Sequence, residues 1–277
     1  MSKIKTLFLA ANPIGTSQLK LDEEIRAITA KIRASEYRDL LELVSGWAVR
    51  PDDLLQSLNE HKPQIVHFSA HGSLSGEIIF VDNNGTSKPV SNKAITALFR
   101  TLKDNIRVVI LNACYSRSQA EAITEVIDCA IGMNTAIGDK AAIIFAASFY
   151  RAIGFGRSVQ EAFEQAKTAL LLEGIPEENT PELLVRAGVD PAQIYLIESD
   201  VPRLKELGEN KKEDPQVISL KTALTQILAE IDTPKVMDFG CGVGTLIPIL
   251  SDIPDFKDKK GVYIGINKPE IEDEIRI

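Results

Sequence analysis

The chain has 277 residues, of which 44% are hydrophobic and 25% charged, a composition typical of a globular protein. Its formal net charge is −8 and it has no cluster of Lys and Arg, which argues against a nucleic-acid-binding protein. No stretch approaches the ~18 apolar residues of a membrane span and no signal peptide is recognisable, so we expect a cytoplasmic protein that does not bind membranes.

Strand-like and helix-like patterns alternate along the first 197 residues. Apolar residues recur every three or four positions between 21 and 32, as on one face of a helix. Short apolar runs bounded by turn residues predict strands. In chain order we predict a strand at 6–11, a helix at 21–32, a strand at 40–49, a helix at 50–58, a strand at 64–70, a hairpin at 76–85, a helix at 92–102, a strand at 106–111, a helix at 118–127, a strand at 129–133, helices at 139–153 and 158–172, and a strand at 193–197.

Long helices between strands are typical of crossover connections, so residues 1–197 predict an α/β domain with a mostly parallel sheet flanked by helices. The composition then changes. Ten of the 17 residues from 198 to 214 are charged, which predicts a linker. Residues 215–277 predict a third region, which contains an amphipathic helix at 215–231 and strands at 235–239 and 263–267.

Two of the predicted strands end in residues that can do chemistry. One reads HFSAHG and contains His71, and the other reads VVILNACYS and contains Cys114. Ligands of parallel α/β sheets bind outside the carboxyl ends of the strands, and both residues fall just beyond such an end. If the two strands are neighbours, the imidazole and the thiol face one another.

A nucleophilic cysteine needs a base, because an ordinary thiol is mostly protonated at neutral pH. An imidazole can take that proton and later return it to a leaving amine. Gly72 has no Cβ, so its backbone N–H can approach a substrate carbonyl oxygen and, with the N–H of Cys114, form an oxyanion hole. Spacing alone leaves open that His71 and Cys114 are merely packed at the strand ends.

The remaining candidates are more simply explained by packing. Cys129 lies inside a short predicted strand, and His67 lies inside the strand that precedes His71. The three cysteines, at positions 114, 129 and 241, stand far apart without a CxxC pair. We therefore expect reduced thiols, no disulfide framework, no metal and no cofactor.

The segments HFSAHG and VVILNACYS resemble the paired signatures of the CHAT peptidases, which belong to the caspase–separase–gingipain group. The resemblance continues in order through IGM at 131–133, DKAA at 139–142 and GRSV at 156–159, and it covers roughly residues 5–197. It implies a caspase-like α/β fold and a Cys–His dyad without an obligatory third acid. Asn-Ala precedes Cys114 where true caspases have Gln-Ala, so aspartate specificity is not implied.

Carried onto this sequence, the resemblance implies that His71 is the general base and Cys114 the nucleophile. The backbone N–H groups of Gly72 and Cys114 are then the oxyanion hole. Asn112 and Ser116 are expected to shape the substrate pocket beside the nucleophile.

Two acidic residues are further candidates for the pocket. Asp139 is expected to cap a helix, to line the pocket, or both. If Asp139 or Glu77 lines the primary pocket, a basic residue before the scissile bond is favoured.

CHAT domains commonly act in bacterial defence or programmed cell death, where a sensor switches them on and they cut a partner protein. The resemblance thus implies a cysteine endopeptidase that acts as an activated antiviral effector, with a protein substrate and an upstream sensor as its partners. Two alternatives remain. One is a catalytically silent CHAT-fold signalling or binding module, and the other is the regulatory region of a truncated methyltransferase.

The second alternative comes from the C-terminal region. VMDFGCGVG at 236–244 resembles the first motif of Rossmann-type S-adenosylmethionine methyltransferases, and YIGIN at 263–267 resembles their second strand. That strand normally ends in an acid that holds the ribose, whereas here it ends in Asn267. The 46 residues from Asp232 onwards are too few for a catalytic methyltransferase domain. The fragment is a remnant, the product of a truncation, or the start of a larger protein, and we favour truncation.

Overall fold

The computed structural model describes residues 3–197 and the backbone of three short strands further along the chain. Residues 1–198 form one compact unit and residues 199–277 form another. None of the helices within residues 3–197 is long and apolar enough to cross a membrane.

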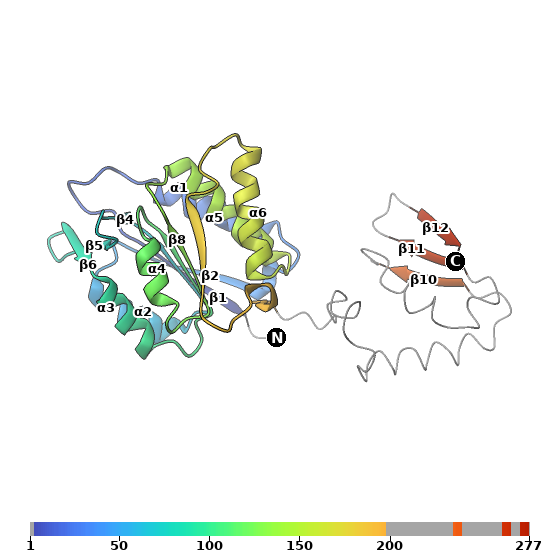
Figure 1. The fold of residues 1–277 in the computed structure, drawn as a ribbon, viewed down its shortest axis with the longest axis horizontal. Coiled ribbons are helices and arrows are strands. Elements are labelled where there is room, and N and C mark those ends of the chain that lie inside the picture. The colour runs from blue at the N-terminus through green and yellow to red at the C-terminus, as the bar shows by residue number, and fades with distance from the viewer. Residues whose placement is uncertain (1–2, 198–234, 240–261, 267–271, 277) are drawn as a thin grey trace. The chain divides into compact units, whose positions relative to one another are not determined.

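The first unit is built on a six-stranded sheet with helices on both of its faces (Figure 1). Five strands are parallel and the sixth is antiparallel to its neighbour. In spatial order the strands are β2 (Leu41–Trp47), β1 (Ile4–Ala10), β3 (Ile65–Ser69), β7 (Val108–Asn112), β8 (Cys129–Met133) and β9 (Pro181–Val185). The predicted mostly parallel α/β sheet is confirmed.

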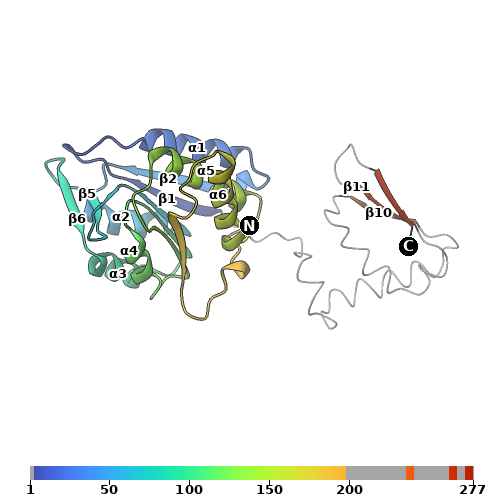
Figure 2. The same cartoon turned by 45° about the horizontal axis from the view of Figure 1, so that its top comes forward.

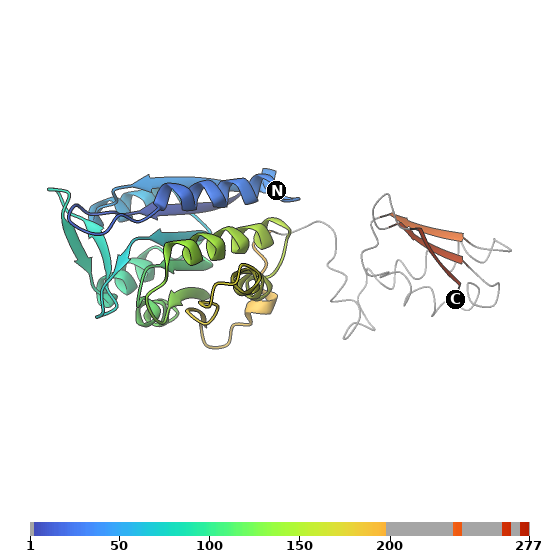
Figure 3. The same cartoon turned by 90° about the horizontal axis from the view of Figure 1, so that it is seen from above.

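Two groups of three helices cover the two faces of the sheet (Figure 3). One face is covered by α1 (Leu21–Arg33), α5 (Asp139–Gly154) and α6 (Val159–Leu172). The other is covered by α2 (Pro51–His61), α3 (Asn92–Thr101) and α4 (Arg117–Ile123). Alternate residues of a strand point to opposite faces, so Phe8 belongs to the first cluster and Leu7 to the second.

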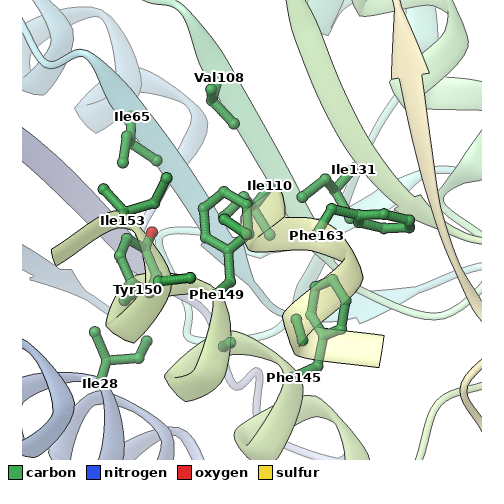
Figure 4. Packing of buried hydrophobic residues seen from close by; sticks show 14 of the residues in the cluster. Ile28, Ile65, Val108, Ile110, Ile131, Phe145, Phe149, Tyr150, Ile153 and Phe163 are labelled. Carbon is green, nitrogen blue, oxygen red and sulfur yellow. The ribbon is translucent and has the colours of Figure 1, made fainter. Parts of the chain in front are cut away.

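Helix α5 supplies much of the first cluster (Figure 4). Phe145, Phe149 and Ile153 are buried completely or nearly so. They are packed in one cluster with Ile65 of β3 and Val108 of β7. This packing explains why the segment at 139–153 is apolar on most sides, since a helix buried between a sheet and two other helices has little surface exposed to water.

A small antiparallel sheet stands at one end of the large one (Figures 1 and 2). It contains β4 (His71–Gly72), β5 (Ile78–Val81) and β6 (Ser87–Val90). The last two form the predicted hairpin, whose turn includes Gly85 at φ +81°. β4 follows β3 after a single residue, so pairing with the hairpin fixes the backbone of His71 just beyond the end of β3.

The prediction of a strand at 193–197 is wrong. Residues 191–193 form a 3-10 helix, and Ile194 and Leu196 are buried in the cluster that contains α6. The Ile194 carbonyl accepts a hydrogen bond from the backbone N–H of Val159, at 2.9 Å. The apolar pattern therefore arises from packing against a helix and not from pairing with a strand.

The last strand of the sheet is instead β9, which the pattern did not predict. Among the described strands it pairs with β8 alone, and it opens on Pro181, which is tolerated because an edge strand leaves one row of N–H groups unpaired. Most of its side chains are only half-buried, so its hydrophobic signal is weak.

Several predicted helix ends also differ, and α2 runs to His61, three residues beyond its predicted end. Helix α4 ends at Ile123, four residues earlier than predicted. Asp139 does not cap α5, because the N-cap residue is Gly138 and Asp139 is the first helical residue. The backbone N–H of Gly138 donates to Oε2 of Glu177 at 2.8 Å, so a carboxylate distant in sequence binds at this helix end.

In the second unit the structure describes β10 (Lys235–Phe239), β11 (Val262–Ile266) and β12 (Glu272–Arg276). β10 and β11 pair in parallel, and β12 pairs antiparallel with β11. The strand predicted at 235–239 is confirmed, and the strand predicted at 263–267 begins one residue earlier. The predicted linker at 198–214, the helix at 215–231 and the glycine motif at 240–244 lie outside the described residues.

Candidate active site

A pocket opens at the carboxyl ends of β3 and β7, and both His71 and Cys114 line it. The two strands are direct neighbours, and Ser69 is paired with Asn112 as the last residue of each. His71 and Cys114 follow this pair by two residues each. The expectation that these two strand ends lie side by side is thus confirmed.

One part of the pocket wall is apolar. Its residues come from the segment that enters α1 and from the start of α5, and include Leu19, Leu21, Ile137, Ala142 and Ile143. An apolar wall of this kind can contact an apolar group of a ligand while polar atoms of that ligand lie near the thiol and the imidazole.

Cys114 is half-buried, and its Sγ lies 4.0 Å from the carbonyl oxygen of Ile137. The next residue, Tyr115, has φ +57°, in the left-handed region that non-glycine residues rarely adopt. The N–H of Tyr115 donates to the carbonyl of Thr135 at 3.2 Å, which helps to hold this conformation. The chain therefore turns sharply directly after Cys114, a feature that often marks functional positions.

The ring of His71 is held in one orientation by the chain that precedes α1. Its Nε2 lies 2.8 Å from the backbone carbonyl oxygen of Ser17. A carbonyl oxygen can only accept, so Nε2 must carry the hydrogen of this bond. In the neutral ring the lone pair is then on Nδ1, and this nitrogen is the one that can act as a base.

Gly72 is in very close contact with the backbone of the nucleophile candidate. A Cβ placed on Gly72 would lie 1.8 Å from the carbonyl oxygen of Cys114. The sequence suggested glycine here so that its N–H could approach a substrate. The structure adds a separate requirement, because any side chain would push the end of β7 away from β4.

Of the four residues predicted to shape the pocket, Asn112 and Asp139 line it. Asn112 is 5% exposed, and its Nδ2 donates to Oε1 of Glu24 at 2.6 Å. Asp139 is half-buried at the start of α5. Asp139 therefore lies at the pocket and does not cap α5, and its role in substrate selection stays a prediction.

The other two residues, Ser116 and Glu77, are not among the residues that line this pocket. Ser116 is 1% exposed, and its hydroxyl bridges two strands by donating to Leu111 and accepting from the N–H of Met133. Glu77 accepts hydrogen bonds from the hydroxyl groups of its loop, 2.7 Å from Ser75. Both side chains thus hold local structure through these hydrogen bonds, and their roles in substrate binding stay predictions.

Sequence reasoning missed several residues of the pocket, among them the buried acid Glu24. This carboxylate is 3% exposed, lines the pocket, and accepts hydrogen bonds from Ser69 and Asn112. A signal was present in the sequence, since Glu24 falls between Leu21 and Ile28 on the predicted apolar face of its helix. A charged residue on a buried helix face needs partners, and the sequence alone did not show them.

The family comparison matches residues 19–182 to the CHAT domain. The chain belongs to the CHAT-domain family. The match spans more than half of the chain and includes both strand ends of the pocket.

Two relatives of this CHAT domain are named as proteases. A Roc-COR-CHAT protease from an unknown prokaryotic organism is 28% identical over 181 residues, which is 63% of this chain and 17% of that protein. A probable protease from Gillisia limnaea is 27% identical over 168 residues, which is 59% of this chain and 30% of that protein. The chain thus spans less than a third of the length of either relative.

Among solved structures, the Arg-specific cysteine proteinase gingipain R resembles the CHAT domain with a TM-score of 0.50 and 10% identity. The similarity covers 69% of this chain and 47% of the gingipain chain. At this identity it supports the caspase-like fold alone.

The two residues interpreted as packing groups are confirmed as such within the CHAT domain. Cys129 is fully buried in β8, and burial raises its pKa to about 12. His67 is fully buried, with Nδ1 3.1 Å from the hydroxyl of Tyr150 and Nε2 3.1 Å from Oε1 of Glu24. The second contact is close but poorly aligned for a hydrogen bond. Neither His67 nor Cys129 lines the pocket.

Proposed function

We propose that this CHAT domain is a cysteine peptidase in which Cys114 is the nucleophile and His71 is the general base. The observation that carries the proposal is that both side chains line one pocket at the ends of paired strands, with His71 held through Nε2. The names of the two relatives support the same reaction class.

In the proposed reaction, Nδ1 of His71 takes the proton of the Cys114 thiol, and Sγ attacks the carbonyl carbon of the scissile peptide bond. The imidazolium then donates the proton to the leaving amine, and a thioester remains. Water, deprotonated by the same imidazole, hydrolyses this thioester and releases the thiol. The Ser17 carbonyl stabilises the imidazolium throughout, because it accepts the Nε2 hydrogen in both charge states of the ring.

The charge that develops on the carbonyl oxygen needs hydrogen-bond donors. We assign this role to the backbone N–H groups of Gly72 and Cys114, as the sequence suggests. The close contact between these two residues is compatible with one shared oxyanion site, because it brings their backbones together beside the pocket.

We further propose that the substrate is a partner protein cut at an internal bond, in response to an upstream sensor, in bacterial defence or programmed cell death. The cytoplasmic location belongs to the same proposal. An activated effector suits a CHAT domain that its relatives carry within much longer chains.

The decisive experiment compares Cys114→Ala with the unchanged chain on a peptide library and on candidate partner proteins. We expect cleavage to fall by at least about a thousandfold, because the nucleophile is removed. Alkylation by iodoacetamide, mapped by peptide mass spectrometry, should modify Cys114 in the folded protein.

Cys129→Ala is the matched control, since it removes a thiol of the same domain that is fully buried and has a pKa of about 12. Cleavage should persist in this variant. Cleavage that survives Cys114→Ala unchanged would exclude the peptidase mechanism and leave the CHAT fold as a binding module.

A further inference from the structure

We propose that Glu24 is a positioning residue: its buried carboxylate ties the ends of β3 and β7 together and so holds His71 and Cys114 in place for the reaction. This inference rests on the proposed peptidase function. It assigns a task to a charged side chain that the reaction steps do not use.

The tie is direct. Ser69 and Asn112 are paired across the two strands as the last residue of each. The hydroxyl of Ser69 donates to Oε2 of Glu24, and Nδ2 of Asn112 donates to Oε1 at 2.6 Å. A single carboxylate therefore contacts both strand ends, two residues before His71 and two residues before Cys114.

The strand ends need such a tie because regular pairing stops there. The Ala70 N–H donates to the Asn112 carbonyl at 3.3 Å, a long bond that extends the ladder by one step. Beyond it, the chain of β3 turns into the hairpin through His71, and the chain of β7 bends at Tyr115. Glu24 comes from a third element, α1, and sets the spacing of the two chains from outside the sheet.

Although Glu24 borders the pocket, its carboxylate is hydrogen-bonded to the protein. It is 3% exposed, and each of its two oxygens accepts a hydrogen bond from the protein. Nε2 of His67 lies 3.1 Å from Oε1 and adds a further polar neighbour. A buried carboxylate keeps its place only where such partners surround it, which makes the geometry at this point rigid.

The same arrangement distinguishes Glu24 from an acid that selects a basic substrate side chain. A selecting carboxylate acts mainly on the binding of one class of substrate. A positioning carboxylate acts on the reacting atoms, so its loss lowers the rate for every substrate. Misplacement of reacting groups by about 1 Å can lower a rate about a hundredfold.

The test is Glu24→Gln, which keeps the shape of the side chain but removes its charge and replaces one acceptor oxygen by an NH₂ donor, so the hydrogen bond that Ser69 or Asn112 donates to this atom is lost or has to be rebuilt with its direction reversed. We expect kcat to fall about 10- to 100-fold on all cleaved peptides, with KM changed less than about threefold. The rate of Cys114 alkylation should fall in the same variant. The pH–rate profile should keep both of its limbs, because Glu24 transfers no proton.

The matched control is Glu23→Gln, the same change one residue earlier on α1. Glu23 is exposed, and its ion pair within residues 3–197 is with Lys20 in the neighbouring turn, at 3.0 Å, so this variant should behave like the unchanged chain. Combining Glu24→Gln with Asn112→Asp gives the new amide an acceptor again and should recover part of kcat. If Glu24→Gln does not fold, Ser69→Ala removes one arm of the tie and should lower kcat by a smaller factor.

Three results would overturn the proposal: unchanged kcat in a folded Glu24→Gln protein, a loss confined to KM for Arg or Lys substrates, or the disappearance of one pH limb. Failure of the proposed function is a separate result, namely that the unchanged chain cleaves no substrate through Cys114. In that case the rate of Cys114 alkylation tests the positioning role of Glu24. An equal rate in Glu24→Gln and in the unchanged chain would reject this role.

Discussion

Single residues around the pocket act mainly through their contacts with the backbone. The Ser17 carbonyl determines which nitrogen of His71 can act as base, and Tyr115 holds a left-handed conformation directly after Cys114. The backbone of Gly72 lies so close to the backbone of Cys114 that there is no room for a side chain at position 72. At this scale the chemistry depends on distances of a few ångströms between backbones.

We predict that Gly72→Ala separates β4 from the end of β7, because the added Cβ would lie 1.8 Å from the Cys114 carbonyl oxygen. Overpacking of this kind costs about 1–3 kcal/mol of stability. The rate of Cys114 alkylation should change by about tenfold or more, since misplacement of about 1 Å is sufficient for that. The loss of stability and the change in the alkylation rate can be measured on the same protein sample.

Gly188→Ala provides the comparison. Its Cβ meets nothing within 4 Å, but φ is +81°, so alanine costs roughly 1–2 kcal/mol through backbone strain alone. The two variants should lose similar stability while only Gly72→Ala alters the reactivity of Cys114. Equal alkylation rates in both variants would contradict the steric explanation.

Among the secondary-structure elements, α6 shows how a helix end determines the path of a distant segment. Ser158 and Glu161 form a capping box at its start. Val159, the residue after Ser158, donates its backbone N–H to the carbonyl of Ile194. This hydrogen bond holds the segment 193–197, which the sequence predicted to be a strand. The capped start of α6 thus fixes the position of the segment that follows the last strand of the domain, because this segment packs and hydrogen-bonds there.

We predict that Ser158→Ala lowers the free energy of unfolding by about 1–2 kcal/mol, because the lost hydroxyl leaves an N–H at the buried helix start without its partner. Urea denaturation followed by the fluorescence of Trp47, the single tryptophan of the chain, measures this loss. Ser91→Ala is the comparison, since Ser91 caps α3 through one longer bond of 3.4 Å at an exposed site. A larger loss for Ser91→Ala would argue against this account.

At the scale of the molecule, the two hydrophobic clusters found in the described residues lie on opposite faces of one sheet. Both consist of residues before 198, and every residue that lines the pocket also lies in this range. The CHAT match ends at 182, within the same compact unit. The core and the candidate active site thus belong to one unit.

We predict that a chain shortened to residues 1–198 folds and keeps its candidate active site. Its thermal midpoint, followed by Trp47 fluorescence, should lie within a few degrees of that of the full chain, because the shortened chain retains both clusters. Alkylation of Cys114 should proceed at the same rate. A shortened chain that is unfolded or aggregated would show that residues 199–277 contribute to the stability of this unit.

The sequence by itself determined most of the fold, because periodicity reports directly which side chains are buried. The period of three to four residues at 21–32 and the apolar runs at 64–70 and 106–111 predicted elements that the structure contains. His71 and Cys114 stood out for the same local reason, since each follows a strand end. The segment at 193–197 was misassigned because burial against a helix and burial in a sheet give similar apolar runs.

The tertiary structure decided what depends on contacts between residues far apart in the sequence. Ser17 lies 54 residues from His71, and Glu24 lies 88 residues from Asn112. Ser116 and Glu77 were predicted to be pocket residues from their places in the sequence, and only the fold shows the local hydrogen-bond partners of their side chains. Hydrogen bonds at such distances have no periodic signature, because they arise only when packing brings the elements together.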